Sequence, residues 1–291
     1  MPNREDRIVT TQSPGNSSQK ALWFIESHFA DALTLDDIAG IAGVSRFQMS
    51  RAFVAATGLP ITRYLRARRL SEAARALAQG ETDILSVALE AGYGSHEAFT
   101  RAFREQFGST PEAVRAQGNL QDIALMEPIS MDHTFTEIEA PRFENSQPLL
   151  IAGLGQRYDV ETSAGIPAQW QRFMPWLETR IPAQLGKVAY GVACNFDDTG
   201  NFEYICGVEV SSFSGLPADW SRLRIPEQRY AVFTHRDHVS TIRRTLNTIW
   251  NKWLPEAGLE AADAPCIERY DENFDSRTGT GGLEIWVAVK D

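Results

Sequence analysis

Two groups of four residues, fifty positions apart, have side chains suited to reading bases in DNA. They are Arg46, Phe47, Ser50 and Arg51 in the first group and His96, Glu97, Thr100 and Arg101 in the second. An arginine can donate two parallel hydrogen bonds to guanine, serine and threonine can bond to several bases, and a glutamate can accept from the cytosine amino group. We therefore expect these eight residues to contact bases in a major groove of double-stranded DNA.

A second set of residues is suited to binding DNA phosphates. The segment between the two groups has Arg63, Arg66 and Arg69 at helical spacing and contains no lysine. Arginine binds phosphate oxygens in a fixed two-pronged geometry. We expect these arginines, together with the hydroxyls of Ser45 and Ser95, to contact the DNA backbone. The alternative for the arginines is an ordinary solvated helix face.

The elements that position these residues form an internal repeat. Its matching residues are Ala39, Gly43, Ser45, Arg51, Phe53 and Gly58 in the first copy and Ala88, Gly92, Ser95, Arg101, Phe103 and Gly108 in the second. Alanine and glycine four residues apart allow two helices to turn sharply, and the serine caps the second helix. The spacing predicts two helix-turn-helix motifs. A plain helical bundle is the alternative.

The second part of the chain predicts a different architecture, a strand–helix–hairpin unit used twice. The expected strands of the first unit are 148–155, 188–194 and 202–210, with a helix at 167–181. Those of the second unit are 229–235, 266–270 and 283–289, with a helix at 239–254. This pattern predicts an α+β domain with pseudo-two-fold symmetry.

The expected organisation is therefore two domains, an all-α domain and an α+β domain. We expect a flexible tail over 1–17, a double helix-turn-helix domain over 18–118, a linker over 119–131 and the α+β domain over 132–291. One chain with two recognition helices can read an asymmetric DNA site, so we expect a monomer or a weak dimer.

Charge is divided unevenly between the two parts. The net charge of −10 argues against DNA binding when taken whole. Residues 1–118 carry 13 basic and 13 acidic side chains, whereas residues 119–291 carry 15 and 25. The acidity thus belongs to the second part, where it favours cationic or neutral ligands over anions.

The three cysteines, Cys194, Cys206 and Cys266, form no dense framework, and no apolar run has the length of a signal peptide or membrane span. We expect a cytoplasmic protein without membrane contact. His235 and His238 lack a third metal ligand at a useful spacing, so we expect neither a metal nor a cofactor.

Residues 20–117 resemble the DNA-binding domain of the AraC/XylS family of transcription regulators. The segment Val87 to Pro111 matches the family signature nearly throughout, and Tyr64 to Leu70 resembles the linker helix of the subgroup that contains MarA, SoxS and Rob. In that subgroup the base-contacting positions correspond to Arg46, Phe47, Ser50, Arg51 and Arg101. Phe47 and Ser50 depart from the side chains common there, which implies a different preferred DNA sequence.

Residues 132–291 resemble the GyrI-like effector-binding domain, which follows an AraC-type DNA-binding domain in Rob. The resemblance rests on segments such as Ile225 to Phe233 and Ile267 to Tyr270. It implies a cleft that binds lipophilic, often cationic molecules against aromatic rings and a carboxylate, here Glu268, with Glu209 and Glu284 as weaker candidates. The implied lining is Trp170, Phe173, Trp176, Tyr190, Tyr204, Tyr270 and Trp286. The alternative is that these rings only fill a core.

The sequence thus predicts a transcription regulator that binds promoter DNA and senses a small molecule, and that is not an enzyme. The effector would act on domain orientation, on oligomeric state or on a contact with RNA polymerase, and the sequence leaves these open. Two other functions remain as alternatives. One is a small-molecule hydrolase fused to a DNA-binding domain, since some GyrI-like proteins are thought to be hydrolases. The other is a constitutive DNA-binding protein with an interaction module.

Overall fold

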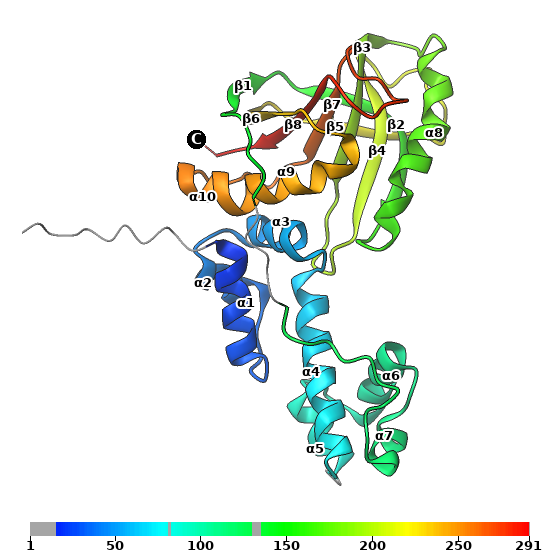
Figure 1. The fold of residues 1–291 in the computed structure, drawn as a ribbon. Coiled ribbons are helices and arrows are strands. Elements are labelled where there is room, and N and C mark those ends of the chain that lie inside the picture. Colours follow the sequence, from blue (N-terminus) through cyan, green and yellow to red (C-terminus); the bar gives the residue numbers. More distant parts are fainter. Residues whose placement is uncertain (1–15, 81–82, 130–134, 291) are drawn as a thin grey trace, which may run out of the picture.

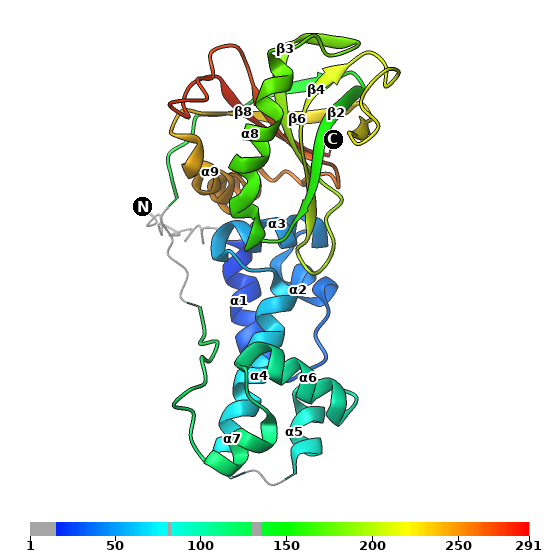
Figure 2. The same ribbon diagram turned by 90° about the vertical axis from the view of Figure 1, so that its right-hand side faces the viewer.

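The computed structural model describes residues 16–80, 83–129 and 135–290. These residues form an elongated molecule, with a small helical region at one end, a second helical region in the middle and a sheet domain at the other end (Figure 1). Figure 2 shows that the helix α4, Ile61–Ala78, joins the two helical regions. Most of the tail expected over 1–17 lies outside the described residues.

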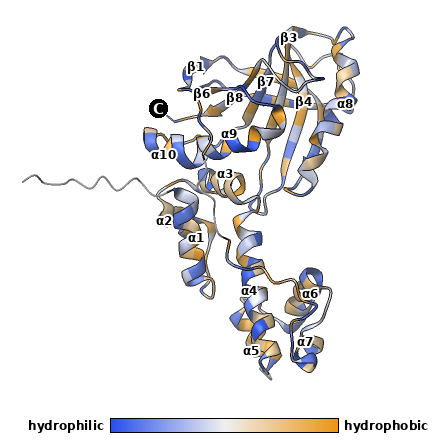
Figure 3. Ribbon diagram, viewed as in Figure 1, coloured by the Kyte–Doolittle hydropathy of each residue, from blue (hydrophilic) through white to orange (hydrophobic). Residues whose placement is uncertain are grey.

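The middle region contains the first helix-turn-helix. Its helices are α1, Ser17–His28, α2, Leu35–Ala42, and α3, Arg46–Thr57. The end region contains the second motif in α5, Ile84–Glu90, and α6, His96–Phe107, followed by α7, Pro111–Gln117. Hydrophobic and hydrophilic stretches alternate on these helices, as expected for helices that bury one face (Figure 3).

The local signals of the repeat produce the predicted geometry. The Ser45 hydroxyl accepts a hydrogen bond from the Gln48 amide, and the Ser95 hydroxyl accepts one from the Ala98 amide, both at 3.2 Å. Gly43 and Gly92 have φ angles of 74° and 83°, which other residues rarely adopt. The two helix-turn-helix motifs are therefore confirmed.

The segment after α7 runs back along the helical regions. Leu120, Ile123 and Leu125 pack on the core of the end region, and Met126 and Ile129 pack on the core of the middle region. Part of the segment expected as a linker is therefore bound to the surface of the helices.

The sheet domain contains one eight-stranded antiparallel sheet. Its strands are β1, Arg142–Ser146, β2, Leu149–Tyr158, β3, Gln184–Cys194, β4, Phe202–Val210, β5, Ser221–Ile225, β6, Gln228–His235, β7, Cys266–Tyr270, and β8, Leu283–Ala288. Their order is β1-β6-β8-β7-β3-β4-β2-β5. The units β2–β3–β4 and β6–β7–β8 are thus arranged symmetrically about the central pair β3–β7, as the repeated pattern predicts.

Two helical segments lie side by side on one face of this sheet. The short turn η1, Thr162–Gly165, leads into α8, Ile166–Leu177, which packs on β2 and β4. The turn η2, Val239–Thr241, leads into α9, Ile242–Thr248, η3, Ile249–Trp253, and α10, Leu254–Ala257. This second segment packs on β6 and β8. Trp170, from α8, and Ile242, from α9, both pack against a small cluster that contains Tyr270 of β7.

The structure differs from the expected elements at three places. The edge strands β1 and β5 were not predicted, because both are short and carry exposed charged residues, as edge strands often do. The helix expected over 239–254 contains a π-helical turn, η3. No helix among the described residues is long and apolar enough to cross a membrane.

Candidate ligand cleft and DNA-reading helices

The central strand pair positions the candidate carboxylate. Glu268 of β7 lies opposite Gly191 of β3 in the antiparallel register. A Cβ atom on Gly191 would lie 2.0 Å from the Tyr204 hydroxyl oxygen and 2.9 Å from Glu268 Oε2. The absence of a side chain at position 191 therefore makes room for the Glu268 carboxylate and its partners.

Two phenols hold the Glu268 carboxylate. The Tyr204 and Tyr270 hydroxyls donate hydrogen bonds to Glu268 Oε2 at 2.5 and 2.7 Å, and Trp170 Nε1 donates to the Tyr204 oxygen at 3.3 Å. Burial raises the pKa of Glu268, although the two hydrogen bonds act in the opposite direction. Glu268 makes no ion pair with any residue that the structure describes. The site is a partly desolvated acid with no positive partner among the residues that the structure describes.

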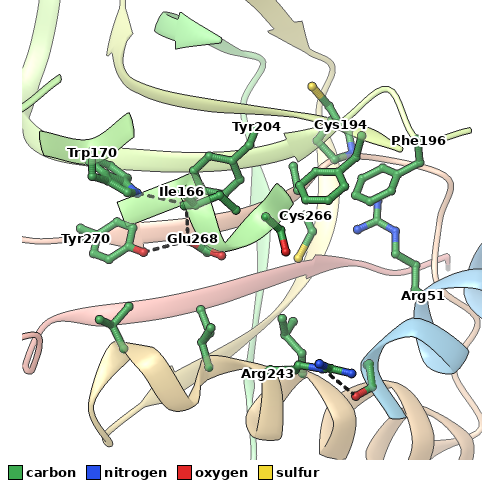
Figure 4. A pocket seen from close by; sticks show the side chains of 18 of the residues that line it. Arg51, Ile166, Trp170, Cys194, Phe196, Tyr204, Arg243, Cys266, Glu268 and Tyr270 are labelled. Atoms are coloured by element: carbon green, nitrogen blue, oxygen red, sulfur yellow. Dashed lines mark hydrogen bonds between the residues drawn. The ribbon is translucent and has the colours of Figure 1, made fainter. Parts of the chain in front are cut away.

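This carboxyl group lies in a large cleft between the sheet domain and the first helix-turn-helix. The cleft has a volume of about 1690 Å³. One end contains Glu268, Tyr204, Tyr270 and Trp170, and the other end contains α3 with Arg51 (Figure 4). Clefts of this kind, with mostly apolar walls and a few polar groups, are typical binding sites for small molecules.

Of the eight residues expected to line the cleft, four do so, namely Glu268, Trp170, Tyr204 and Tyr270. The other four do not line it. Tyr190 and Trp286 lie on the opposite face of the sheet, because successive strand residues alternate between faces. Phe173 is fully buried between α8 and the sheet, and Trp176 packs on Trp220 at the outer side of α8.

The two weaker carboxylate candidates also lie outside the cleft. Glu209 accepts a hydrogen bond from the Tyr190 hydroxyl at 3.2 Å. Glu284 pairs with Arg142 and Arg269 and accepts from the Trp286 indole. His235 is buried and bonds to Thr245. Within the described ranges no group of three metal-ligating side chains comes together.

The second recognition helix, α6, presents its expected base-reading residues on an open surface. Glu97 and Arg101 are exposed, and both line a shallow groove together with His96 and Thr100. The His96 ring also contacts Glu112 at 2.9 Å. This surface is accessible to DNA in the arrangement described.

The first recognition helix, α3, has its corresponding face covered by the sheet domain. Phe47 packs edge-on against Trp250, with ring centroids 6.2 Å apart. Asn251 Nδ2 donates to the Ala52 carbonyl at 2.8 Å, and Arg46 forms a 2.6 Å ion pair with Asp198. The residues expected to read bases, Arg46, Phe47, Ser50 and Arg51, all line the cleft.

Arg51 occupies an aromatic box at the α3 end of the cleft. Its guanidinium carbon lies 3.4 Å from the ring centroid of Phe196, 4.6 Å from that of Phe47 and 5.8 Å from that of Trp250. The Nε and Nη2 atoms are covered and have no hydrogen-bond partner among the described residues. Burial lowers the pKa of Arg51 to about 10, so the side chain remains charged at neutral pH.

The three arginines expected at DNA phosphates are all engaged within the protein. Arg63 pairs with Glu161 at 2.6 Å, and Arg66 pairs with Glu105 at 2.7 Å. Arg69 Nε donates to the Phe29 carbonyl at 2.6 Å, just beyond the end of α1. The hydroxyls of Ser45 and Ser95 cap helices, as described above.

Sequence reasoning missed three residues around α3. Phe196 and Asp198 lie in the loop between β3 and β4, which connects the two strands of the first predicted hairpin. Arg243 of α9 donates to the Val54 carbonyl at 3.2 Å, near the C-terminal end of α3. No local motif marks these residues, because they act on a helix that is far away in the sequence.

Comparison with known proteins supports both parts of this description. Residues 139–290 match the GyrI-like small molecule binding domain, and residues 38–117 match a helix-turn-helix domain. Over 91% of its length the chain is 26% identical to the transcriptional regulator Rob of Salmonella typhimurium and 27% identical to the right origin-binding protein of Escherichia coli, covering 93% of each. It is also 30% identical to the HTH-type transcriptional activator AarP of Providencia stuartii, over 40% of this chain and 88% of AarP.

Proposed function

Because the chain belongs to the GyrI-like family and begins with an AraC-type helix-turn-helix domain, we propose that it is a transcription regulator whose cleft binds a lipophilic cation. It is a DNA-binding transcription regulator with a GyrI-like small molecule binding domain.

One observation carries the proposal: the Glu268 carboxyl group lies in the cleft, and no positive side chain in the described part of the chain pairs with it. An isolated buried carboxylate is unfavourable, and a bound cation would compensate its charge. The rings of Trp170, Tyr204 and Tyr270 surround it, and aromatic faces attract cations. We assign Glu268 as the counter-charge of the effector.

For DNA we propose that α6 reads bases with Arg101 and its neighbours, and that α3 reads a second segment of the same site. The two recognition helices belong to one chain, so a monomer is sufficient for an asymmetric site. We place the protein in the cytoplasm, on promoter DNA.

The decisive experiment compares two ions of the same shape and opposite charge. Tetraphenylphosphonium should quench tryptophan fluorescence on binding, whereas tetraphenylborate should bind far more weakly. The substitution Glu268→Gln keeps an acceptor for the phenols but removes the charge, so it should weaken phosphonium binding by about 10-fold or more. Equal affinity of both ions, or an unchanged affinity in Glu268→Gln, would refute the proposal.

A hydrolase is the second candidate, because a carboxyl group with a raised pKa in a cleft is also suited to general acid–base catalysis. Turnover of reactive esters or epoxides that is lost in Glu268→Gln would favour it. A constitutive DNA-binding protein, the other alternative, has no need for a cleft with an unpaired acid.

A further inference from the structure

The inference concerns Arg51, and it rests on the proposed function of the cleft. In the arrangement described, α3 forms one wall of the cleft through Ser50, Arg51 and Val54. A major groove is about 12 Å wide and is filled by one recognition helix. The face of α3 that packs on Trp250 cannot enter DNA at the same time.

The contact that holds Arg51 has an energetic weakness. A guanidinium taken out of water needs hydrogen-bond acceptors or an ion pair. The structure provides rings instead, and Arg51 Nε and Nη2 remain without partners in the described part of the chain. Two of the three rings, Phe196 and Trp250, belong to the sheet domain and would remain there if α3 moved away. They form a cation subsite that the protein itself fills.

Two ion pairs also hold the helices against the sheet domain. Their carboxylates neutralise arginines that DNA would otherwise neutralise. Arg46 pairs with Asp198 and Arg63 with Glu161, both at 2.6 Å. Both acids belong to the sheet domain, and both arginines are expected DNA contacts. The acidic domain thus occupies groups that would otherwise bind the duplex.

We propose that the ring pair of Phe196 and Trp250 is a second cation subsite of the effector cleft, that Arg51 occupies it as an internal competitor, and that a lipophilic cation releases α3 for DNA binding by displacing Arg51. Glu268 and Arg51 line the same cleft, so a bulky cation drawn to the acid reaches the box as well (Figure 4). By linkage, DNA that holds α3 raises the affinity for the cation by the same factor.

The first test uses two variants that each remove one positive charge from the lining of the cleft. Arg51→Met removes the guanidinium from the box, whereas Lys187→Met removes a cation that also lines the cleft but makes no ring contact among the described residues. Arg51→Met should bind tetraphenylphosphonium about tenfold more tightly than Lys187→Met does. Equal affinities of the two variants would overturn the inference.

The second test needs no substitution. Saturating the wild-type protein with tetraphenylphosphonium should accelerate amide hydrogen exchange in α3. Exchange in α6 should stay unchanged, because α6 lies in the end region, away from the sheet domain (Figure 1). Unchanged or slower exchange in α3 would overturn the inference, and the proposed function would stand if binding still depended on Glu268. Binding that does not depend on Glu268 would refute the proposed function, and this inference with it.

Discussion

Gly191 and Glu268 face each other across the central pair of strands, one from each strand–helix–hairpin unit. One unit supplies the acid, and the other supplies the space that the acid and its phenol partners occupy. The proposed ligand site therefore depends on the register of β3 and β7 as much as on the carboxylate itself.

The substitution Gly191→Ala should abolish the cation site. The added methyl group would overlap the Tyr204 hydroxyl, and neither strand can shift without disturbing the sheet. We expect tetraphenylphosphonium binding to weaken by about 10-fold or more, measured by fluorescence titration. The control is Gly40→Ala, where an added Cβ atom meets no atom within 4 Å. Full binding in Gly191→Ala would contradict the geometry.

Cation binding should weaken as the pH falls. Burial raises the pKa of Glu268 in the free protein, whereas a bound cation favours the ionised form and lowers that pKa. Affinity is therefore highest above the raised pKa and decreases as the pH is lowered through it, with proton release on binding near that pH. The nearby Tyr204 and Tyr270 have pKa values well above 10, because they are buried, and stay protonated.

Calorimetry in two buffers with different ionisation enthalpies measures this proton release. Glu268→Gln should show neither the release nor the decrease in affinity. A proton release that persists in Glu268→Gln would assign the titration to another group.

Removing the two acids that hold the arginines should favour DNA binding. Asp198→Asn with Glu161→Gln weakens only the arrangement in which α3 is covered. Exposed ion pairs contribute about 0–1 kcal/mol each, so we expect about 3- to 10-fold tighter binding to a duplex selected with the wild-type protein. The matched control is Glu144→Gln with Glu260→Gln, which breaks two exposed ion pairs away from α3. Equal gains in both double variants would indicate only a general charge effect.

Arg101 should contribute to sequence preference and Arg66 to general affinity. Arg101 is exposed on α6, so Arg101→Ala should cost about 1–3 kcal/mol on the selected duplex and relax the preference at one position. Arg66→Ala should weaken binding to all duplexes alike and reduce the salt dependence. Selection from random DNA followed by titration at several salt concentrations measures both. If neither variant changes binding, the DNA-reading assignment is wrong.

Local signals in the sequence were sufficient for most elements. The caps and turns of the repeat are specified locally, by Ser45, Ser95 and the glycines after them. The strands β4 and β7 have the predicted bounds. The edge strands β1 and β5 were missed, because a short strand with charged residues has no clear alternation.

The position of α3 could not be predicted, because periodicity indicates which face of a helix is apolar or polar but not what covers it. Phe47 beside Arg51 was the available signal, since an aromatic ring on an outward helix face suggests a partner surface. The same limit applies to the cleft. Tyr190 and Trp286 have suitable side chains. Side chains alternate between the two faces along a strand, however, and the positions of these two residues place them on the other face of the sheet.

The position of Arg51 on the same chain as the box has a consequence for the dose response. A tethered competitor has a fixed effective concentration, which does not change with the amount of protein in the cell. The effector concentration at which α3 is released is then set by the strength of the Arg51 contact and by the fraction of molecules already open. A single substitution at Phe196 would move that threshold without altering Glu268, the proposed counter-charge of the effector, or Arg51, the proposed base-reading arginine.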